Sequence, residues 1–371
     1  MLSVKEVRKM NNIKQIEVIY DNRLVGRLAL TKEGLCAFEY SVEWLDSGFS
    51  ISPFELPLKS GVFIAKPRPF EGGFGVFDDC LPDGWGLLIL DRYLQQKGVN
   101  PRTLTLLDRL ALVGSTGRGA LEFRPDKSVI TRQDYVDFEK LALEAEQILD
   151  SDDYTGEGIE EFQDRGGSPG GARPKIFVRY DNKEWLVKFR AKRDPQSIGI
   201  DEYRYSLLAK QCGIEMPETR LFEDKYFGVE RFDRTPNGKL HVESMAGLIG
   251  ADYRLPSIDY AHIFQVCAML THSVAELWKV YRLMVFNYLI GNKDDHAKNF
   301  AFIYRDGDWH FAPAYDLLPS DGINGFRTTS INDKIEPTKK DLFAVAVRVG
   351  LKEKDTMYCL EKIQKTINYY M

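Results

Sequence analysis

Apolar and polar residues alternate along the first part of the chain. Within residues 14–30 this alternation runs on both sides of Asp21 and Asn22, which is typical of two antiparallel strands joined by a tight turn. More short strands are expected up to about residue 64. The apolar spacing then becomes helical over residues 81–96, and a second helix over 103–112 precedes a Gly-rich turn and a strand. The pattern predicts an N-terminal α/β module over residues 1–125, with residues 1–9 as a loose tail or as an extension from an upstream start codon.

The pattern changes twice more along the chain. An acidic segment with Ala and Leu at helical spacing predicts a linker helix and a loop, assigned to residues 126–165. A Gly-rich loop, two strands (KIFVRY and WLVKFRA), a helix over 201–212 and a further strand region make up residues 166–235. Helices dominate from about residue 257, so residues 236–371 are expected to form a helical lobe. A strand-rich lobe and a helical lobe predict a two-lobed α+β fold with a nucleotide cleft between them.

Composition excludes several classes of protein but does not identify a function. The chain has 371 residues and a formal net charge of −5, which suggests neither direct nucleic-acid binding nor a basic membrane surface. Its five cysteines are scattered without a C-x-x-C pair, so neither a disulfide framework nor a structural zinc site is expected. The longest apolar run, near residues 283–290, is too short to cross a bilayer. The first residues lack the apolar core of a signal peptide, so we expect a cytoplasmic protein.

The strongest candidate for chemistry is the segment GNKDDHAKN, residues 291–299, directly after an apolar helix. Asp294 and Asn299 are five positions apart, which is the spacing of the catalytic loop of protein kinases. Asp294 would orient the attacking hydroxyl, and Asn299 would present an amide oxygen to Mg²⁺, a cation that prefers oxygen ligands. His296 and Lys298, in the same loop, are expected to support it. The same spacing also fits a polar helix cap followed by an ordinary loop.

A second acidic position follows this loop after a predicted hairpin. Asp316, in AYDLLP, stands where a kinase places its other metal-binding carboxylate. Its neighbours are apolar, and we expect the carboxylate to be buried, where a bound cation would offset the cost. Alternatively, Asp316 caps the turn that follows.

Upstream, Lys188 is the charged residue in the apolar strand WLVKF, which follows the Gly-rich segment. A lysine here can reach the phosphates of ATP, and Glu202 on the next helix could pair with it. The Gly-rich segment can offer backbone N–H groups to phosphate, with Gly170, Gly171 and Ala172 as the candidates. Alternatively, Lys188 is an outward-facing strand residue, and Glu202 is a carboxylate favoured at a helix N-terminus. The alternative for the Gly-rich segment is a flexible loop.

The segment VERFDR, residues 229–234, lies between the strands and the helical region, where a hinge between lobes is expected. Hinge backbone groups can bind adenine, and Asp233 could reach the ribose. The alternative is a strand end with surface ion pairs.

Taken in order, GGSPGGARPK, WLVKF, VERFDR, GNKDDHAKNF and APAYDLLP resemble the C-terminal region of HipA-type toxin kinases, and LPDGWGLLILDRYL resembles the HipA N-terminal module. The resemblance implies a protein-kinase-like fold and a serine/threonine kinase that binds ATP and Mg²⁺. Asp294 would be the catalytic aspartate, and Asn299 and Asp316 would be the Mg²⁺ ligands. Lys188 would contact phosphate, and the backbones of Glu230 and Phe232 would bind adenine. Ser168 would be the autophosphorylated serine.

The same resemblance implies partners. They are a HipB-like DNA-binding antitoxin and a host protein substrate, with an aminoacyl-tRNA synthetase as the best-known example and growth arrest as the outcome. Two other readings stay open: a small-molecule phosphotransferase with the same catalytic loop, and a non-catalytic binding module. The retention of Lys188, Asp294, Asn299 and Asp316 argues against the second.

Overall fold

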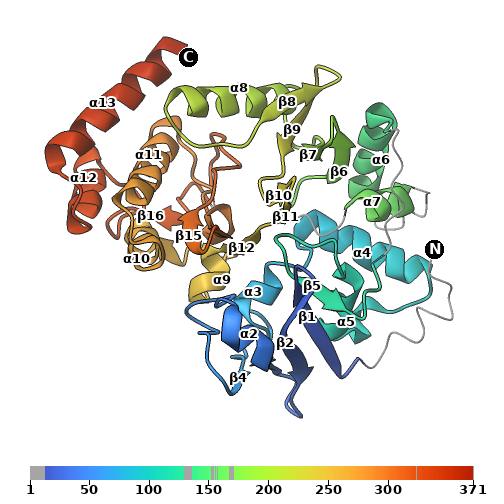
Figure 1. The fold of residues 1–371 in the computed structure, drawn as a ribbon. Helices are drawn as coiled ribbons and strands as arrows, with labels where there is room; N and C mark the ends of the chain where they lie inside the picture. The colour runs from blue at the N-terminus through green and yellow to red at the C-terminus, as the bar shows by residue number, and fades with distance from the viewer. Residues whose placement is uncertain are drawn as a thin grey trace. The chain divides into compact units, whose positions relative to one another are not determined.

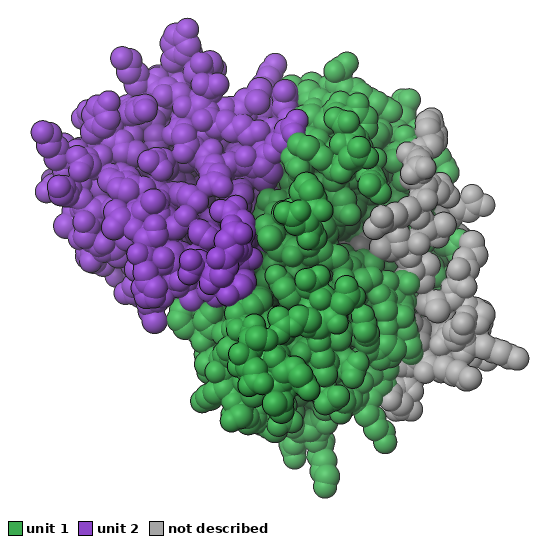
Figure 2. All heavy atoms as spheres, viewed as in Figure 1, with its two compact units in different colours: residues 1–200, 220–241 green, residues 201–219, 242–371 purple. Residues whose placement is uncertain are grey.

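The computed structural model describes residues 13–128, 136–151, 154, 156, 158–166, 171–322 and 324–370. Figure 1 shows the order of the elements along the chain. The chain divides into two compact units, coloured separately in Figure 2. Unit 1 comprises residues 1–200 and 220–241, and unit 2 comprises residues 201–219 and 242–371. The N-terminal module and the second sheet therefore belong to the same unit.

Unit 1 begins with an antiparallel sheet in the order β4-β3-β2-β1-β5. Its strands are β1 (Gln15–Tyr20), β2 (Arg23–Leu30), β3 (Cys36–Tyr40), β4 (Val62–Ile64) and β5 (Glu122–Arg124). The predicted hairpin is confirmed, because Asp21 and Asn22 both have positive φ and join β1 to β2, as a two-residue hairpin turn requires. One face of this sheet packs on α3 and α5 through buried apolar residues such as Phe38, Phe77 and Leu110.

Short helices surround this sheet. They are α2 (Val42–Ser47), α3 (Gly75–Asp78), α4 (Gly84–Gln96), the 3-10 helix η1 (Pro101–Thr103) and α5 (Leu106–Val113). Helix α5 begins with a capping box in which Thr105 and Asp108 each bind the other's backbone N–H, an arrangement that satisfies two otherwise unpaired donors. The capping box explains why α5 starts later than the predicted 103.

A second sheet, in the order β6-β7-β9-β8, completes unit 1. Its strands are β6 (Lys175–Tyr180), β7 (Lys183–Lys188), β8 (Thr219–Phe222) and β9 (Tyr226–Glu230). The apolar face of β6 and β7 packs on α4, α6 (Phe138–Asp150) and α7 (Gly158–Gly166) through residues that include Trp85, Phe162 and Trp185. The predicted linker helix and loop are instead two helices, since residues 158–166 carry apolar side chains that reach this core. Helix α4 thus ties the N-terminal module to the second sheet.

Short strands and then helices follow. The strands are β10 (Arg234–Thr235), β11 (Gly238–Lys239), β12 (His241–Ser244), β13 (Ile258–Asp259), β14 (Ala301–Arg305), β15 (Asp308–Phe311) and β16 (Thr329–Ser330). The helices are α8 (Ile198–Gln211), α9 (Met245–Ile249), α10 (Tyr260–Thr271), α11 (Val274–Ile290), η2 (Ala297–Asn299), α12 (Lys339–Arg348) and α13 (Glu353–Tyr370).

The core of unit 2 forms around α10 and α11, with α12, α13, β14 and β15 packed on them. The Tyr281 hydroxyl on α11 donates to the Thr356 carbonyl at 2.9 Å and joins α11 to α13. No helix among the residues described is long and apolar enough to span a membrane.

Candidate active site

The predicted catalytic loop begins where α11 ends. Gly291 caps this helix with a left-handed backbone (φ 74°), a conformation that glycine adopts without strain. The next residue, Asn292, is buried, and its amide binds three parts of the site. It donates to Asn287 Oδ1 at 3.1 Å and to the Asp316 carbonyl at 3.4 Å, and its Oδ1 accepts the Asp294 N–H at 3.1 Å. Asn292 therefore connects the Asp294 loop to the Asp316 segment.

The structure brings Asp294, Asn299 and the Asp316 segment together within unit 2. Asn299 Nδ2 donates to the Asp294 carbonyl at 2.9 Å, which turns the amide oxygen of Asn299 away from that carbonyl. Ser320 closes the other side, because its Oγ accepts the Asp294 N–H at 2.9 Å and donates to Asn292 Oδ1 at 3.1 Å. The loop is thus held by side chains on both flanks.

Asp316 has a positive φ of 60°, which is uncommon for a residue with a side chain. Such backbone strain persists where surrounding contacts impose it and is frequent at functional sites. The expectation that Asp316 is buried is wrong: the residue is exposed, although Ala314 and Leu317 beside it are buried. Burial cost therefore supplies no argument for a cation here, whereas the exposed carboxylate is accessible to one.

The neighbour of Asp294 has the opposite environment. Asp295 is only 1 % exposed, and its Oδ2 accepts the Tyr260 hydroxyl at 2.7 Å and lies 3.8 Å from Arg327 Nη1. Its Oδ1 is buried without a hydrogen-bond partner among the residues described. Burial raises the pKa of Asp295 to about 7, despite the opposing effects of Arg327 and Tyr260.

His296 and Lys298 were predicted to support the loop, and the structure shows their contacts. His296 Nδ1 accepts the Lys298 N–H at 3.3 Å and so caps η2. The Lys298 ammonium lies 4.2 Å from the centroid of the Tyr253 ring, and the Lys298 carbonyl accepts the Tyr315 hydroxyl at 2.7 Å. Both residues therefore shape the backbone between Asp294 and Asn299.

In unit 1, Lys188 is the last residue of β7 and lies directly opposite Lys175 of β6. Residues in such pairs project from the same face of the sheet, and here it is the face away from the apolar core of α4, α6 and α7. Lys175 Nζ lies 2.7 Å from the position that a Cβ on Gly171 would occupy. Lys175 therefore lies beside the described end of the Gly-rich loop, and Lys188 projects from the same face of the sheet. Lys175 was not predicted as a nucleotide contact, although the sequence GGARPK places it directly after the Gly-rich loop.

The N-terminal module holds that end of the loop. Asp83 Oδ1 accepts the Gly171 N–H, and Trp85 N–H donates to the Gly171 carbonyl at 3.0 Å. A Cβ on Gly84 would lie 2.5 Å from the Gly171 carbonyl oxygen, so a glycine is needed where the two backbones meet. Ala172 follows Gly171 and is exposed. The predicted Gly170 and Ser168 lie outside the described residues.

The hinge segment follows β9. The Arg231 N–H donates to the Glu184 carbonyl at 2.8 Å, and alternation along an antiparallel strand turns the backbone groups of Glu230 away from β7. The Glu230 carboxylate pairs with Lys183 at 2.9 Å, and Phe232 begins the turn toward β10. Glu202 is buried on α8 in unit 2, whereas Lys188 is in unit 1.

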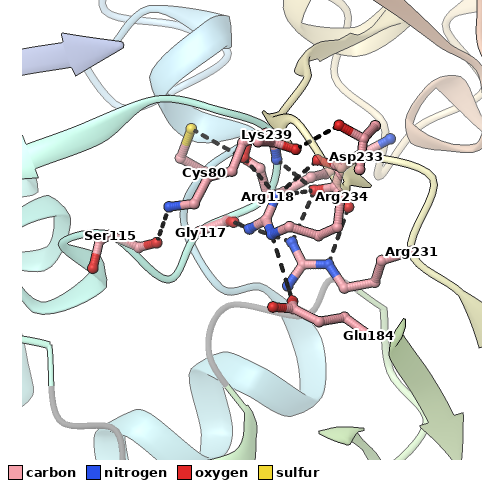
Figure 3. Close-up of polar contacts among 12 residues, drawn as sticks. Cys80, Ser115, Gly117, Arg118, Glu184, Arg231, Asp233, Arg234 and Lys239 are labelled. Carbon is pink, nitrogen blue, oxygen red and sulfur yellow. Dashed lines mark hydrogen bonds and ion pairs between the residues drawn. The ribbon is translucent and has the colours of Figure 1, made fainter. Parts of the chain in front are cut away.

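Asp233 does not match its predicted role at a ribose. It is buried, and its carboxylate binds Arg231 Nη2 at 2.8 Å, Arg234 Nη1 at 2.9 Å and the Gly119 N–H at 2.8 Å. Burial alone would raise its pKa, but the two guanidinium groups hold the pKa of Asp233 well below its usual range. Its oxygens serve an internal ion-pair cluster (Figure 3).

These elements define a two-lobed, kinase-like α+β protein with an added N-terminal module, and the predicted fold class is confirmed. Residues 16–124 match the family model of the HipA N-terminal domain, and residues 167–369 match that of the HipA-like C-terminal domain. The chain therefore belongs to the HipA family, which confirms the resemblance seen in the sequence.

Its relatives include Y4dM of Sinorhizobium fredii, which is 27% identical over 91% of this chain and 87% of that protein. The serine/threonine-protein kinase toxin HipA of Shewanella oneidensis is 24% identical over 87% of this chain and 79% of that protein. A structure of Shewanella oneidensis HipA, solved in complex with HipB and operator DNA, has the same fold, with a TM-score of 0.71 and 21% identity, covering 96% of this chain and 89% of that one. Family and relatives together support a kinase.

Proposed function

We propose that the chain is an ATP- and Mg²⁺-dependent serine/threonine protein kinase that acts as a HipA-type toxin. The observation that supports this most strongly is the joined loop of unit 2, in which Asn292 links the Asp294 N–H to the Asp316 carbonyl and Asn299 bonds to the Asp294 backbone. A loop held in this way presents a carboxylate for the acceptor hydroxyl beside two oxygen ligands for a cation.

The donor set fits Mg²⁺. The amide oxygen of Asn299 is turned away from the Asp294 carbonyl, and Asp316 is exposed. Mg²⁺ usually takes one or two protein oxygens together with water and substrate phosphate. Among the residues described, no group of three or more His, Cys, Asp or Glu side chains could form a cage for a metal ion, and such a cage is not needed here. When bound, Mg²⁺ would neutralise charge on the phosphates during transfer.

Other residues carry the remaining roles. Asp294 orients the acceptor hydroxyl and accepts its proton. Lys188 and Lys175 neutralise phosphate at the Gly-rich loop. The backbone groups of Glu230 and Phe232 bind adenine. A HipB-like antitoxin is the proposed partner, and the protein substrate proposed first is an aminoacyl-tRNA synthetase, with growth arrest as the consequence.

The test uses purified protein with Mg²⁺ and labelled ATP, first alone and then with host lysate. We expect labelled protein in both reactions, and Asp294→Asn and Asp316→Asn should each lower the rate by about 10²-fold or more at unchanged thermal stability. Asp321→Asn, an exposed acidic residue of the same region, is the matched control and should retain activity. Phosphate transfer in lysate to a small molecule only would favour a small-molecule phosphotransferase, and near wild-type rates in both variants would refute the assignment.

A further inference from the structure

A loop of the N-terminal module and the hinge segment are joined by a dense set of polar contacts, drawn in Figure 3. The loop is Ser115–Gly119. Its contacts come from Arg231, Asp233 and Arg234 of the hinge segment and from Lys239, which follows that segment in β11. Arg234 donates from Nη1 to the Gly119 carbonyl and from Nη2 to the Gly117 carbonyl, both at 2.8 Å. Because Asp233 accepts the Gly119 N–H at 2.8 Å, both backbone groups of Gly119 are bound by consecutive hinge residues.

Further contacts extend the cluster at both ends. Arg231 Nη2 donates to the Gly117 carbonyl at 3.3 Å, and Lys239 Nζ donates to the Ser115 carbonyl at 2.6 Å. A Cβ on Gly117 would lie 2.9 Å from a methyl group of Val113, so the loop needs a small residue there. The loop thus presents its carbonyls to the cationic side chains of the hinge segment.

Ion pairs hold the two hinge arginines in this cluster. Arg231 and Arg234 face two carboxylates, those of Asp233 and Glu184, and Glu184 Oε2 lies 3.5 Å from Arg234 Nε. Arg231 and Asp233 are buried, so removing the charge of either leaves a buried partner uncompensated, and the cluster holds one arrangement strongly. The fork of Arg234 reaches two carbonyls at once, which a single ammonium group would not reproduce.

We propose that Arg234 is a positioning residue which, together with Asp233, fixes the adenine-binding hinge to the Ser115–Gly119 loop and thereby sets selectivity for the base of the nucleotide. This inference rests on the proposed kinase function. The second sheet determines the path of the chain only as far as Arg231, whose N–H binds Glu184. Beyond it, the loop contacts of Asp233 and Arg234, together with the Leu240 N–H bond to the Asp233 carbonyl at 3.0 Å, hold the chain on either side of Phe232. Hinge hydrogen bonds tolerate little displacement, since a shift of about 1 Å lowers their contribution severely.

The experiment compares Arg234→Lys with the wild type in titrations with MgATP and MgGTP and in steady-state phosphorylation. We expect the KM and Kd for ATP to rise about tenfold, the strength of roughly one hydrogen bond to a charged group. The kcat at saturating ATP should stay within about twofold, because Arg234 is remote in sequence from the catalytic loop and acts through the hinge. The preference for ATP over GTP should fall by a similar factor, since misplaced hinge groups no longer distinguish the two bases.

Arg109→Lys is the matched control. Arg109 also pairs with a carboxylate, Asp91 at 3.0 Å, and donates to a carbonyl, that of Pro101 at 3.1 Å, but it has no contact with the hinge among the described hydrogen bonds. Its substitution should lower thermal stability and leave ATP affinity and base preference unchanged. If Arg234→Lys does not fold, Lys239→Met removes only the outer contact to Ser115 and Glu122, and should raise the KM for ATP about threefold.

The outcomes separate the positioning role of Arg234 from the proposed kinase function. Loss of thermal stability in Arg234→Lys with unchanged KM and unchanged ATP-over-GTP preference would show that the cluster is only structural and would overturn the inference. A wild-type protein that binds neither nucleotide would instead refute the proposed kinase function.

Discussion

Asp295→Asn should remove a pH dependence from the stability of the protein. The carboxyl group of Asp295 is 1 % exposed, and burial raises its pKa to about 7 from an ordinary value of 3.8. An acid with a raised folded pKa holds its proton in the native state at pH values where the unfolded chain has released it. The free energy of unfolding therefore falls as pH rises from about 4 to about 7 and then levels off.

The size of the effect follows from this interval. Each pH unit inside the interval changes the free energy of unfolding by about 1.4 kcal/mol. An asparagine at this position does not titrate, so the difference in stability between Asp295→Asn and the wild type should shift in favour of the variant by about 2 kcal/mol between pH 5.5 and pH 8. Tyr260 and Arg327, which contact the carboxylate, keep other partners: Asn287 Nδ2 donates to the Tyr260 hydroxyl at 3.1 Å, and Arg327 donates to the Asn292 carbonyl at 2.9 Å.

Denaturant unfolding at a series of pH values, without nucleotide, measures this difference. Asp308→Asn, which removes one exposed negative charge from the same unit, controls for net charge and should show no comparable shift. A difference between Asp295→Asn and the wild type that stays constant from pH 5.5 to pH 8 would refute the reasoning, because the buried carboxylate would then titrate alike in the folded and unfolded chains.

Two further substitutions test the proposed nucleotide site in unit 1. Gly84→Ala would place a Cβ 2.5 Å from the Gly171 carbonyl oxygen, whereas Gly98 at the other end of α4 also has a positive φ but has nothing within 4 Å of its Cβ position. Both alanine variants should lose about 1 kcal/mol of stability to backbone strain, and Gly84→Ala should lose more because its Cβ meets the Gly171 carbonyl. Only Gly84→Ala should also weaken ATP binding; equal ATP affinity in the two would contradict the loop contact. Lys188→Ala should weaken MgATP binding about tenfold in calorimetry at nearly unchanged thermal stability, while Lys192→Ala, an exposed lysine paired with Asp150, should not; unchanged affinity in both would mean that Lys188 is an ordinary strand residue.

Local patterns predicted much of this molecule. The alternation around Asp21 and Asn22 and the helical spacing from about residue 257 depend only on neighbouring residues, and the structure has β1 and β2 in the first region and α10 and α11 in the second. The spacing of Asp294 and Asn299 is also local, since one short loop decides how the two residues meet. Such features can be read from a sequence because few distant contacts alter them.

The missed features depend on distant partners. Asp233 binds Gly119, a residue 114 positions earlier, and nothing in VERFDR reveals that its carboxylate is already engaged. Asp294 and Asp295 are adjacent and chemically identical, yet one is exposed and the other buried. Asn292 was also missed, although Asn287, the polar residue within the apolar run 283–290, was a visible indication of a buried hydrogen-bond network.

The contacts within unit 1 bear on what the N-terminal module contributes to a kinase. It meets the rest of this unit at two separate points: Asp83 and Trp85 bind the backbone of Gly171, and the Ser115–Gly119 loop binds Asp233 and Arg234. One point is at the proposed phosphate loop and the other at the proposed adenine hinge. A chain lacking the module would leave the buried charges of Asp233 and Arg231, and the half-buried Arg234, without their backbone partners, at a cost that few other contacts could offset. The module is therefore a structural part of unit 1 rather than an appended domain, and this explains why LPDGW carries a glycine where its backbone meets that of Gly171.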